Sequence, residues 1–381
     1  TGGNNVCYSR DGHEVFTKGD TMGCAIDLDN RIAYWYKNGV RSSFSHDFSS
    51  ASGGTMVGKP FIPFALHRQT GSIKFNFGQK PFRFRPPEGY QTLSTNNIQT
   101  SILPKKHFGI VLYTGDNTIN RDISGLQFKP DFVWIKPRNN VSNHCVLDSV
   151  RGVHNRLLIN SSGANVNNAA TIQAFNVDGF KIGNSSLVNT NGWAHVAWCW
   201  KAGGYSNTFN VDDVGYSTTS AAGITEGSVS LSGASVNREA GFSIVTATAP
   251  GSGNFTIGHG LDSIPDVVIS KSTGSSQYWA IYFRPLTDTN RKYIQFNELN
   301  LRTSGGDMWG ASGHTSTLLG LSAGNAMVAG DTFVCYSWAE KPGFSKYGYY
   351  QGNGDDFDGP FQYTGFRPAL VIYKCTSCLL Y

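Results

Sequence analysis

The sequence predicts an all-β protein built from tandem antiparallel β-sandwich modules. Its main support is a pattern that occurs three times, namely a proline, an extended apolar run and a closing lysine. The copies span Phe128–Lys136, Ile264–Lys271 and Phe366–Lys374. Proline fits the start of a strand because it cannot donate to a sheet, and β-branched and aromatic residues suit a buried strand. The lysine is expected to mark where the strand meets water. A recurring internal pattern indicates a repeated structural unit.

Composition agrees with this fold class and excludes several functions. Glycine contributes 45 of 381 residues, roughly 12% against a usual value of about 7%, and charged residues only 15% against about a quarter. The net charge of +5 is scattered, without the basic stripe expected of a nucleic-acid-binding protein. No apolar run approaches the length that inserts into a membrane. A polar surface with few charges is typical of extracellular or particle-bound β proteins.

The first module is predicted over residues 1–95 from strand and turn signals. Met22–Asp27 and Arg31–Lys37 read as paired strands, and the following Asn38-Gly39 is a strong signal for a tight hairpin. The alternating run Ser72–Phe77 predicts a further strand.

Four separated stretches of this module resemble a SPRY domain: Gly19–Asp29, Tyr36–Gly39, Phe75–Phe82 and Pro87–Tyr90. The resemblance implies a concanavalin-like, bent antiparallel β-sandwich that binds partners through loops at one end, without catalysis. Tyr34, Trp35 and Tyr36 are the candidate recognition residues. Two interpretations stay open, since these aromatics either pack within the sheet or form an exposed platform for a sugar or a protein. Strand alternation predicts that Trp35 and the two tyrosines differ in exposure.

The rest of the chain reads as two copies of a second module. The opening strand His107–Tyr113 matches Gly241–Thr246, and the Trp-rich closing strand Val196–Lys201 matches Val334–Ala339. We therefore expect these segments after the first module: a linker at 96–106, copy one at 107–204, a Gly-, Ser- and Ala-rich connector at 205–240, copy two at 241–345, and residues 346–381, which either start a third repeat or complete copy two.

This second module resembles a repeat of unknown function found in virion proteins of marine tailed phages. The resemblance is carried by Gly125–Lys136, Leu147–Gly152, Asp178–Phe180 and Val196–Ala202. In such proteins the repeat often follows a SPRY or other lectin-like sandwich, which is the order found here. The resemblance implies a location on the surface of the virion.

Few residues form a pattern that indicates chemistry. Asp148 and Arg151 are close enough in sequence for a local ion pair, with a binding role as the alternative, and copy two lacks the run that contains them. Asp355, Asp356 and Asp358 form an acidic loop in which a turn and a weak cation site are both open interpretations. No nucleophile elbow, phosphate loop or zinc-protease motif occurs. We predict no catalytic residues, no metal site beyond that weak candidate, and no cofactor.

The sequence thus predicts a non-enzymatic phage virion protein. We expect a tail fibre or other host-facing appendage that binds a cell-surface glycan or a protein receptor, together with other virion subunits. By analogy with fibre proteins it would be a homo-oligomer, expected to be a trimer. The alternative is a purely structural subunit, such as a capsid decoration or tail-collar protein, that contacts only other virion proteins.

Overall fold

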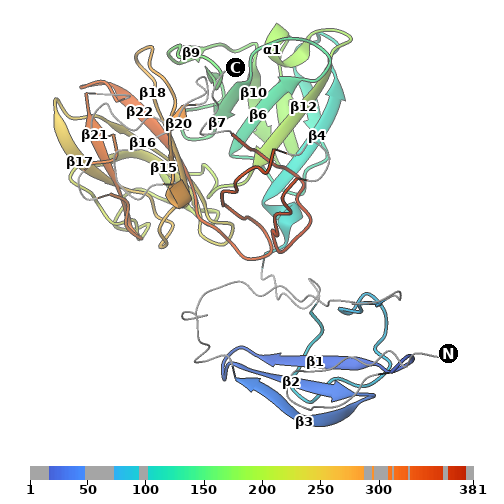
Figure 1. Ribbon diagram of the computed structural model, residues 1–381. Coiled ribbons are helices and arrows are strands. Elements are labelled where there is room, and N and C mark those ends of the chain that lie inside the picture. Colours follow the sequence, from blue (N-terminus) through green and yellow to red (C-terminus); the bar gives the residue numbers. More distant parts are fainter. Residues whose placement is uncertain are drawn as a thin grey trace. The chain divides into compact units, whose positions relative to one another are not determined.

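The computed structural model describes residues 17–47, 73–93, 102–286, 294–295, 308–310, 313–324, 327–354 and 359–374. The chain divides into two compact units, residues 1–99 and 100–381 (Figure 1). Among the described residues of both units, the regular structure is almost entirely antiparallel β-strand, which confirms the all-β fold class. Among the described residues, no helix is long and apolar enough to cross a membrane.

The first unit contains a three-stranded antiparallel sheet of β1 (Met22–Asp27), β2 (Ile32–Lys37) and β3 (Val40–Asp47). Asn38 and Gly39 join β2 to β3 with φ angles of 46° and 84°. A two-residue hairpin of this kind needs positive φ at both positions, so the predicted Asn-Gly hairpin is confirmed. Gly39 is required for space as well, because a Cβ there would lie 2.8 Å from the Phe84 ring.

The strand predicted over Ser72–Phe77 does not form in its described part, residues 73–77. Side chains of this segment bond to nearby backbone instead. Asn76 accepts from the Gly78 amide at 3.1 Å, and Gln79 donates to the Phe75 carbonyl at 2.7 Å and accepts from the Phe77 amide at 2.6 Å. Such local bonds offer the backbone an alternative to a sheet ladder.

In the second unit, copy one is a β-sandwich of two sheets. The small sheet has the order β10-β11-β5 and the large sheet the order β4-β12-β6-β7-β8-β9. A 3-10 turn (η2, Pro104–Lys106) precedes the copy, and a short helix (α1, Ser186–Asn189) precedes its last strand. The strands are β4 (Phe108–Thr114), β5 (Arg121–Ser124), β6 (Phe132–Pro137), β7 (Cys145–Asp148), β8 (Asn155–Leu158), β9 (Val166–Asn167), β10 (Ile172–Asn176), β11 (Gly179–Ile182) and β12 (Ala194–Trp200).

Copy two repeats this strand order. Its large sheet contains β16-β22-β18-β19-β20, the counterpart of β4-β12-β6-β7-β8, and its small sheet pairs β17 with β21. A 3-10 turn (η3, Arg284–Leu286) follows β19. The strands are β16 (Phe242–Thr248), β17 (Gly253–Gly258), β18 (Val267–Ser272), β19 (Ala280–Phe283), β20 (Ile294–Gln295), β21 (Leu318–Ala323) and β22 (Thr332–Trp338). The first two occurrences of the proline pattern therefore form β6 and β18. Each of these strands pairs with the last strand of its copy, β12 or β22.

Residues 205–240 are not the connector that their composition predicts. They contain β13 (Phe209–Val211), β14 (Val214–Tyr216) and β15 (Leu231–Asn237), which extend the large sheet of copy two beyond β16. Small residues serve close packing here, since Ala234 and Ser235 are fully buried. The Ser235 hydroxyl accepts from the Gly203 amide and donates to the Gly204 carbonyl, both at 2.8 Å.

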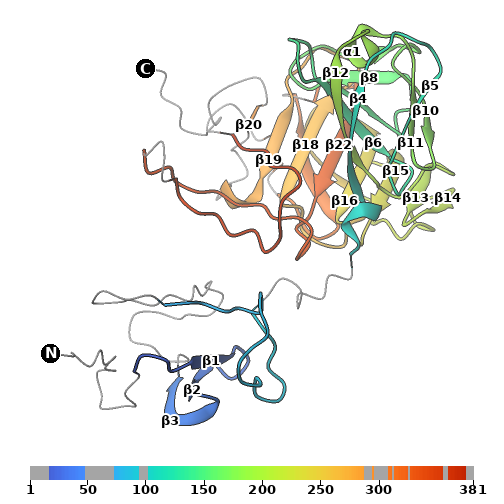
Figure 2. The same cartoon turned by 90° about the vertical axis from the view of Figure 1, so that its right-hand side faces the viewer.

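The described residues of the second unit form four β layers with three cores between them. Figure 1 labels strands of both copies, and Figure 2 shows them after a 90° turn. One core lies between the small and large sheets of copy one, and includes Val133 and Phe180. A second lies between the large and small sheets of copy two, and includes Val268 and Leu319. The third joins the two large sheets to each other, and includes Phe132, Trp279 and Tyr336 from both copies.

The aspartate that follows the repeated proline makes an equivalent hydrogen bond in both copies. Asp131 accepts a hydrogen bond from the Ala202 amide at 2.8 Å and another from the Ser149 hydroxyl at 2.8 Å. Asp266 likewise accepts from the Glu340 amide at 2.7 Å. Ala202 and Glu340 follow the last strands β12 and β22 at equivalent positions. The carboxylate thus fastens the end of the last strand to the start of the central strand.

The closing lysine of the pattern does not simply mark the contact of the strand with water. Lys271 is buried, and its Nζ donates to the carbonyls of Ser272 at 2.7 Å and Ser275 at 3.3 Å. Burial lowers the pKa of Lys271 to about 8. Lys136 bonds in the same way to the Asn140 carbonyl at 3.2 Å. The lysine therefore closes the turn after the central strand by donating to backbone carbonyl groups there.

Candidate functional site

The three aromatic residues of the first unit lie along β2, and all three are half-buried. The β2–β3 register shifts between Tyr34 and Tyr36, and the difference in exposure expected between Trp35 and the tyrosines stays a prediction. A bulge of this kind interrupts the strict alternation of faces. The Arg41 guanidinium lies 4.3 Å from the centre of the Tyr34 ring. Sheet packing and partial exposure therefore coexist at this strand.

Asp148 and Arg151 form the local ion pair that their spacing allows. Arg151 Nε lies 2.6 Å from Asp148 Oδ2, and the Arg151 amide donates to Asp148 Oδ1 at 2.8 Å. Tyr336, from copy two, donates its hydroxyl to the same carboxylate at 2.6 Å. Both charged side chains are buried between the large sheets, so neither offers a surface to a ligand. At the register position equivalent to Asp148, copy two has Phe283.

Asp355, Asp356 and Asp358 lie outside the described residues, so the cation alternative for this loop stays a prediction. Within the described part of the chain, no three His, Cys, Asp or Glu side chains gather closely enough to hold a metal ion.

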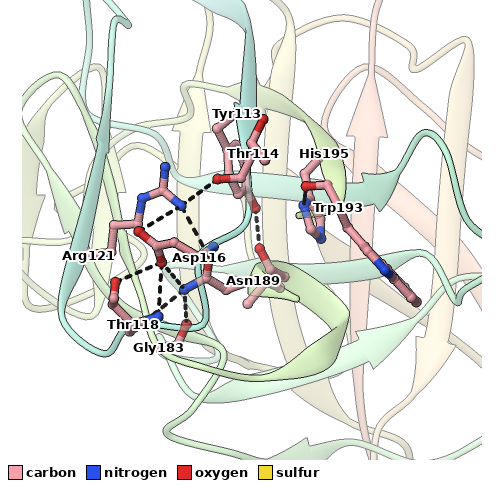
Figure 3. Close-up of polar contacts among 10 residues, drawn as sticks. Tyr113, Thr114, Asp116, Thr118, Arg121, Gly183, Asn189, Trp193 and His195 are labelled. Carbon is pink, nitrogen blue, oxygen red and sulfur yellow. Dashed lines mark hydrogen bonds and ion pairs between the residues drawn. The ribbon is translucent and has the colours of Figure 1, made fainter. Parts of the chain in front are cut away.

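A site that the sequence did not indicate lies at the β4–β5 loop, residues 115–120 (Figure 3). Its centre is Asn189, which ends α1 and is fully buried. The Asn189 side-chain carbonyl accepts from the Asp116 amide at 3.0 Å. Its side-chain amide donates to the carbonyls of Thr118 at 2.8 Å and Gly183 at 3.1 Å. One side chain therefore holds the loop against two distant segments.

Hydrogen bonds within the loop add to the bonds from Asn189. Asn117 and Asn120 have φ angles of 59° and 58°, a left-handed conformation that asparagine tolerates better than most residues. Asp116 Oδ1 accepts from the Thr118 amide at 2.9 Å and from its hydroxyl at 2.8 Å. These bonds lower the pKa of Asp116, the bond from the Thr118 amide most strongly, so the carboxylate is ionised at neutral pH. Ile119 is left at the tip, 62% exposed.

Arg121 closes the loop from the first position of β5. Its Nη1 donates to the Thr114 carbonyl at 2.6 Å and lies 3.3 Å from Asp116 Oδ2. The guanidinium also lies 5.7 Å from the centre of the Tyr113 ring, close enough for a cation–π contact. Its charge is thus shared between a carboxylate and an aromatic face.

Beneath the loop, Tyr113 stacks on His195 with ring centroids 5.1 Å apart and planes at 8° (Figure 3). The Tyr113 hydroxyl donates to the Val188 carbonyl at 2.7 Å, and His195 Nδ1 lies 2.9 Å from the Trp193 carbonyl. Burial lowers the pKa of His195, so its ring is held neutral. The result is a rigid aromatic support under the exposed loop.

Copy two does not repeat this arrangement. The strand registers place Ala247 where copy one has Tyr113 and Phe333 where it has His195. The corresponding loop, residues 249–252, has four residues where copy one has six. The braced loop is therefore specific to copy one, although the strands around it are shared.

Two family matches account for most of the chain. Residues 103–379 match the domain of unknown function DUF7483, and residues 3–80 match the SPRY domain. The chain belongs to the DUF7483 family. Its first unit carries a SPRY domain, as the sequence resemblance predicts, and the DUF7483 domain spans both copies together with the segment after them.

Among curated proteins, the chain is 35% identical over 81 residues to the ATP-dependent RNA helicase DDX1 of Xenopus laevis. The match covers 21% of this chain, which spans only about a tenth of the length of that relative. No solved structure matches the chain.

The geometry of the 115–120 loop suits the binding of a ligand. An ionised carboxylate, a guanidinium and a threonine hydroxyl supply polar contacts, and Ile119 supplies an apolar one. Because the loop is already ordered, a ligand would not have to bear the entropy cost of ordering it. Asp116 and Arg121 are only five residues apart in the sequence. Asn189, which holds the loop in place, lies 73 residues beyond Asp116, so no local sequence motif predicts this contact.

Replacing Asn189 by alanine should destabilise the second unit by about 2–3 kcal/mol, because several buried partners would lose their hydrogen bonds. Urea denaturation followed by tryptophan fluorescence measures this. Asn167→Ala is the matched control, since that side chain is exposed and makes one 3.3 Å bond; a loss below about 0.5 kcal/mol is expected there. Equal losses in both variants would show that Asn189 does not brace the loop.

Proposed function

We propose that this chain is a non-enzymatic virion protein of a tailed phage, part of a tail fibre or other host-facing appendage that binds a cell-surface glycan or a protein receptor. The observation that carries the binding proposal is the braced, exposed 115–120 loop, which copy one has and copy two lacks. Residues that form the scaffold are expected to be shared by both copies. Residues held in place in only one copy, and exposed there, are the better candidates for recognition.

The chemistry of the loop favours a polar, hydroxyl-rich ligand. A charged carboxylate and a threonine hydroxyl bond readily to sugar hydroxyls, and an exposed isoleucine can pack against the apolar face of a sugar ring. The Tyr34–Arg41 pair of the SPRY domain is a second candidate surface for a glycan or a protein. The helicase match covers a tenth of that protein, so we propose no helicase activity for this chain.

The location on a phage virion is supported by the resemblance of the repeat to domains of marine phage virion proteins and by the order of the two domains. Other virion subunits would then be the permanent partners. A symmetric homo-oligomer, a trimer by analogy with fibres, would present several loops at once, which strengthens weak attachment through multivalency.

A purely structural virion subunit is the second candidate, and one observation favours it. Ile110 and Leu112 are exposed on β4, on the sheet face where the neighbouring strands carry Trp198 and Trp134. Apolar side chains gathered on a sheet face can mark a contact with another protein.

Saturable binding of the full chain to whole bacterial cells and to their purified surface polysaccharide is the expected result, measured with fluorescently labelled protein. The polysaccharide should keep its length during the incubation. New reducing ends would contradict the non-enzymatic part of the proposal. Absence of binding to every host tested, with retained binding to other virion subunits, would favour the structural alternative.

A further inference from the structure

Strand β4 forms one edge of the large sheet of copy one. Among the described strands it pairs with β12 on one side only, at the margin of the sheet (Figure 1). Its counterpart in copy two, β16, lies inside its sheet, because β15 pairs with its other side from Phe242 to Ala247. No described strand of copy one takes the place of β15, since the residues just before β4 form the 3-10 turn η2.

Main-chain bonds at the two ends of the β4–β12 ladder show which backbone groups face the open edge. The Lys201 amide donates to the His107 carbonyl at 2.9 Å, and the Gly115 amide donates to the Trp193 carbonyl at 2.8 Å. Hydrogen-bonded and non-hydrogen-bonded positions alternate along an antiparallel pair. The odd-numbered residues of β4 therefore bond to β12, and the even-numbered residues direct their amides and carbonyls away from it.

The even-numbered residues at the centre of the strand are Phe108, Ile110 and Leu112. Among the described residues, no backbone group pairs with their outward amides and carbonyls. In copy two the position equivalent to Ile110 is Ile244, which pairs with Ser235 of β15. The edge of β4 is therefore a ladder position that the same scaffold fills in copy two.

No charged side chain protects this edge. The sequence of β4 is Phe-Gly-Ile-Val-Leu-Tyr-Thr, and Ile110 and Leu112 are 40% and 59% exposed. Edge strands are commonly protected from pairing by lysine, proline, a bulge or short length. The other edges of the two large sheets, β9, β14 and β20, have two, three and two residues, whereas β4 has seven. Of these edges, only a second β4 matches β4 in length.

We propose that two copies of this chain pair through β4, antiparallel, about a two-fold axis at Ile110. This register places Ile110 opposite its own copy, and Phe108 opposite Leu112 of the second copy. All of these residues face outward, so each pair can exchange main-chain hydrogen bonds. Because the strand carries no charge, the pairing opposes no like charges, and apolar side chains meet across the ladder.

The side chains beside this edge continue an existing interface. On the same face of the sheet, Trp198 of β12 lies next to Ile110, and Trp134 of β6 lies next to Trp198. The two indole rings contact each other edge to face, with centroids 5.5 Å apart. Farther along this face, Phe132 packs against copy two. An added β4 would extend this apolar face beyond the present edge of the sheet.

This contact is distinct from the trimer expected by analogy with fibres. A three-fold axis cannot place two copies of one strand antiparallel to each other, whereas a two-fold axis does so directly. The pairing also does not depend on the proposed virion role, because it follows from the strand alone.

Sedimentation velocity and hydrogen exchange of the full chain, over a roughly hundredfold range of concentration, test the pairing. Exchange of the Ile110 and Leu112 amides should slow as the concentration rises. Ile110→Pro removes an outward donor, which an edge strand tolerates, and should weaken self-association roughly tenfold or more. Leu112→Lys should weaken it too, since lysine on an edge strand opposes pairing. Val141→Pro, at a fully exposed loop position, is the matched control and should change nothing.

Three results would overturn the proposal. The first is rapid exchange of the Ile110 and Leu112 amides at every concentration. The second is protection that does not depend on concentration, since a segment of the same chain would then cover β4. The third is self-association that neither Ile110→Pro nor Leu112→Lys weakens more than Val141→Pro does.

Discussion

Replacing Asp148 by alanine is expected to lower the free energy of unfolding by about 3–5 kcal/mol, because the change strands a buried guanidinium. Arg151 would lose its carboxylate partner, and the Tyr336 hydroxyl its acceptor. All three groups lie between the two large sheets, where a polar group without a hydrogen-bond partner raises the free energy of the folded state. The substitution should therefore weaken the packing of the large sheet of copy one against the large sheet of copy two.

Urea denaturation of the full chain measures this loss. Asp122→Ala is the matched control, because its 3.7 Å ion pair with Lys181 is exposed and should contribute less than about 1 kcal/mol. The double variant Asp148→Leu with Arg151→Met should recover part of the stability, since paired apolar residues of similar size can replace a buried ion pair, although the Tyr336 hydroxyl still lacks its acceptor. A single-variant loss no larger than the control would contradict the buried-pair account.

Acidification is expected to destabilise the second unit as the pH falls below about 6.5. His259 is buried and His314 half-buried in copy two, and burial of the imidazole rings lowers the pKa of His259 to about 4 and that of His314 to about 3. The unfolded chain takes up protons near the ordinary pKa, whereas the folded chain does not. Stability is therefore fully present above pH 6.5 and is lost as the pH falls towards these lowered values.

Asp131 acts in the opposite direction, because burial raises its pKa to about 6 and the folded state then gains protons below that pH. Two histidines against one aspartate leave a net loss of roughly 1.4 kcal/mol for each pH unit between 6 and 4. The same direction of change comes from the other histidines of the second unit whose pKa is lowered by burial, namely His107, His144 and His195. Urea denaturation across this pH range measures the slope. His314→Asn keeps an acceptor for the Gly320 amide, now bonded to Nδ1 at 3.2 Å, and should flatten the slope. An unchanged slope would show that His314 does not titrate on unfolding.

Local sequence signals predicted the parts of the fold that depend on neighbouring residues. The Asn38-Gly39 hairpin follows from the positive φ that a two-residue turn requires. The central strands β6 and β18 follow from a proline start and a buried apolar run. The Asp148–Arg151 pair follows from a spacing of three residues, although its partner Tyr336 lies 188 residues beyond Asp148.

The features that were missed depend on distant contacts or on ambiguous composition. A Gly-, Ser- and Ala-rich stretch suits a flexible linker and equally a closely packed strand, and burial of Ala234 and Ser235 decides between them. The sequence of residues 115–120 predicts an ordinary turn. Only the fold shows that Asn189 hydrogen-bonds to this loop. The burial of Lys271 likewise depends on the turn that folds over it, which a strand pattern alone does not show.

The central claim, that recognition resides in the loop specific to copy one, is tested most directly by comparing two variants with the same charge change. Ile119→Asp alters the tip of the 115–120 loop, and Ser252→Asp alters an exposed position in the shorter loop of copy two. Both should keep the thermal unfolding midpoint of the unaltered chain. Binding of the full chain to host cells should weaken at least tenfold in Ile119→Asp and remain unchanged in Ser252→Asp. Undiminished binding by Ile119→Asp, or equal losses in both variants, would contradict the claim.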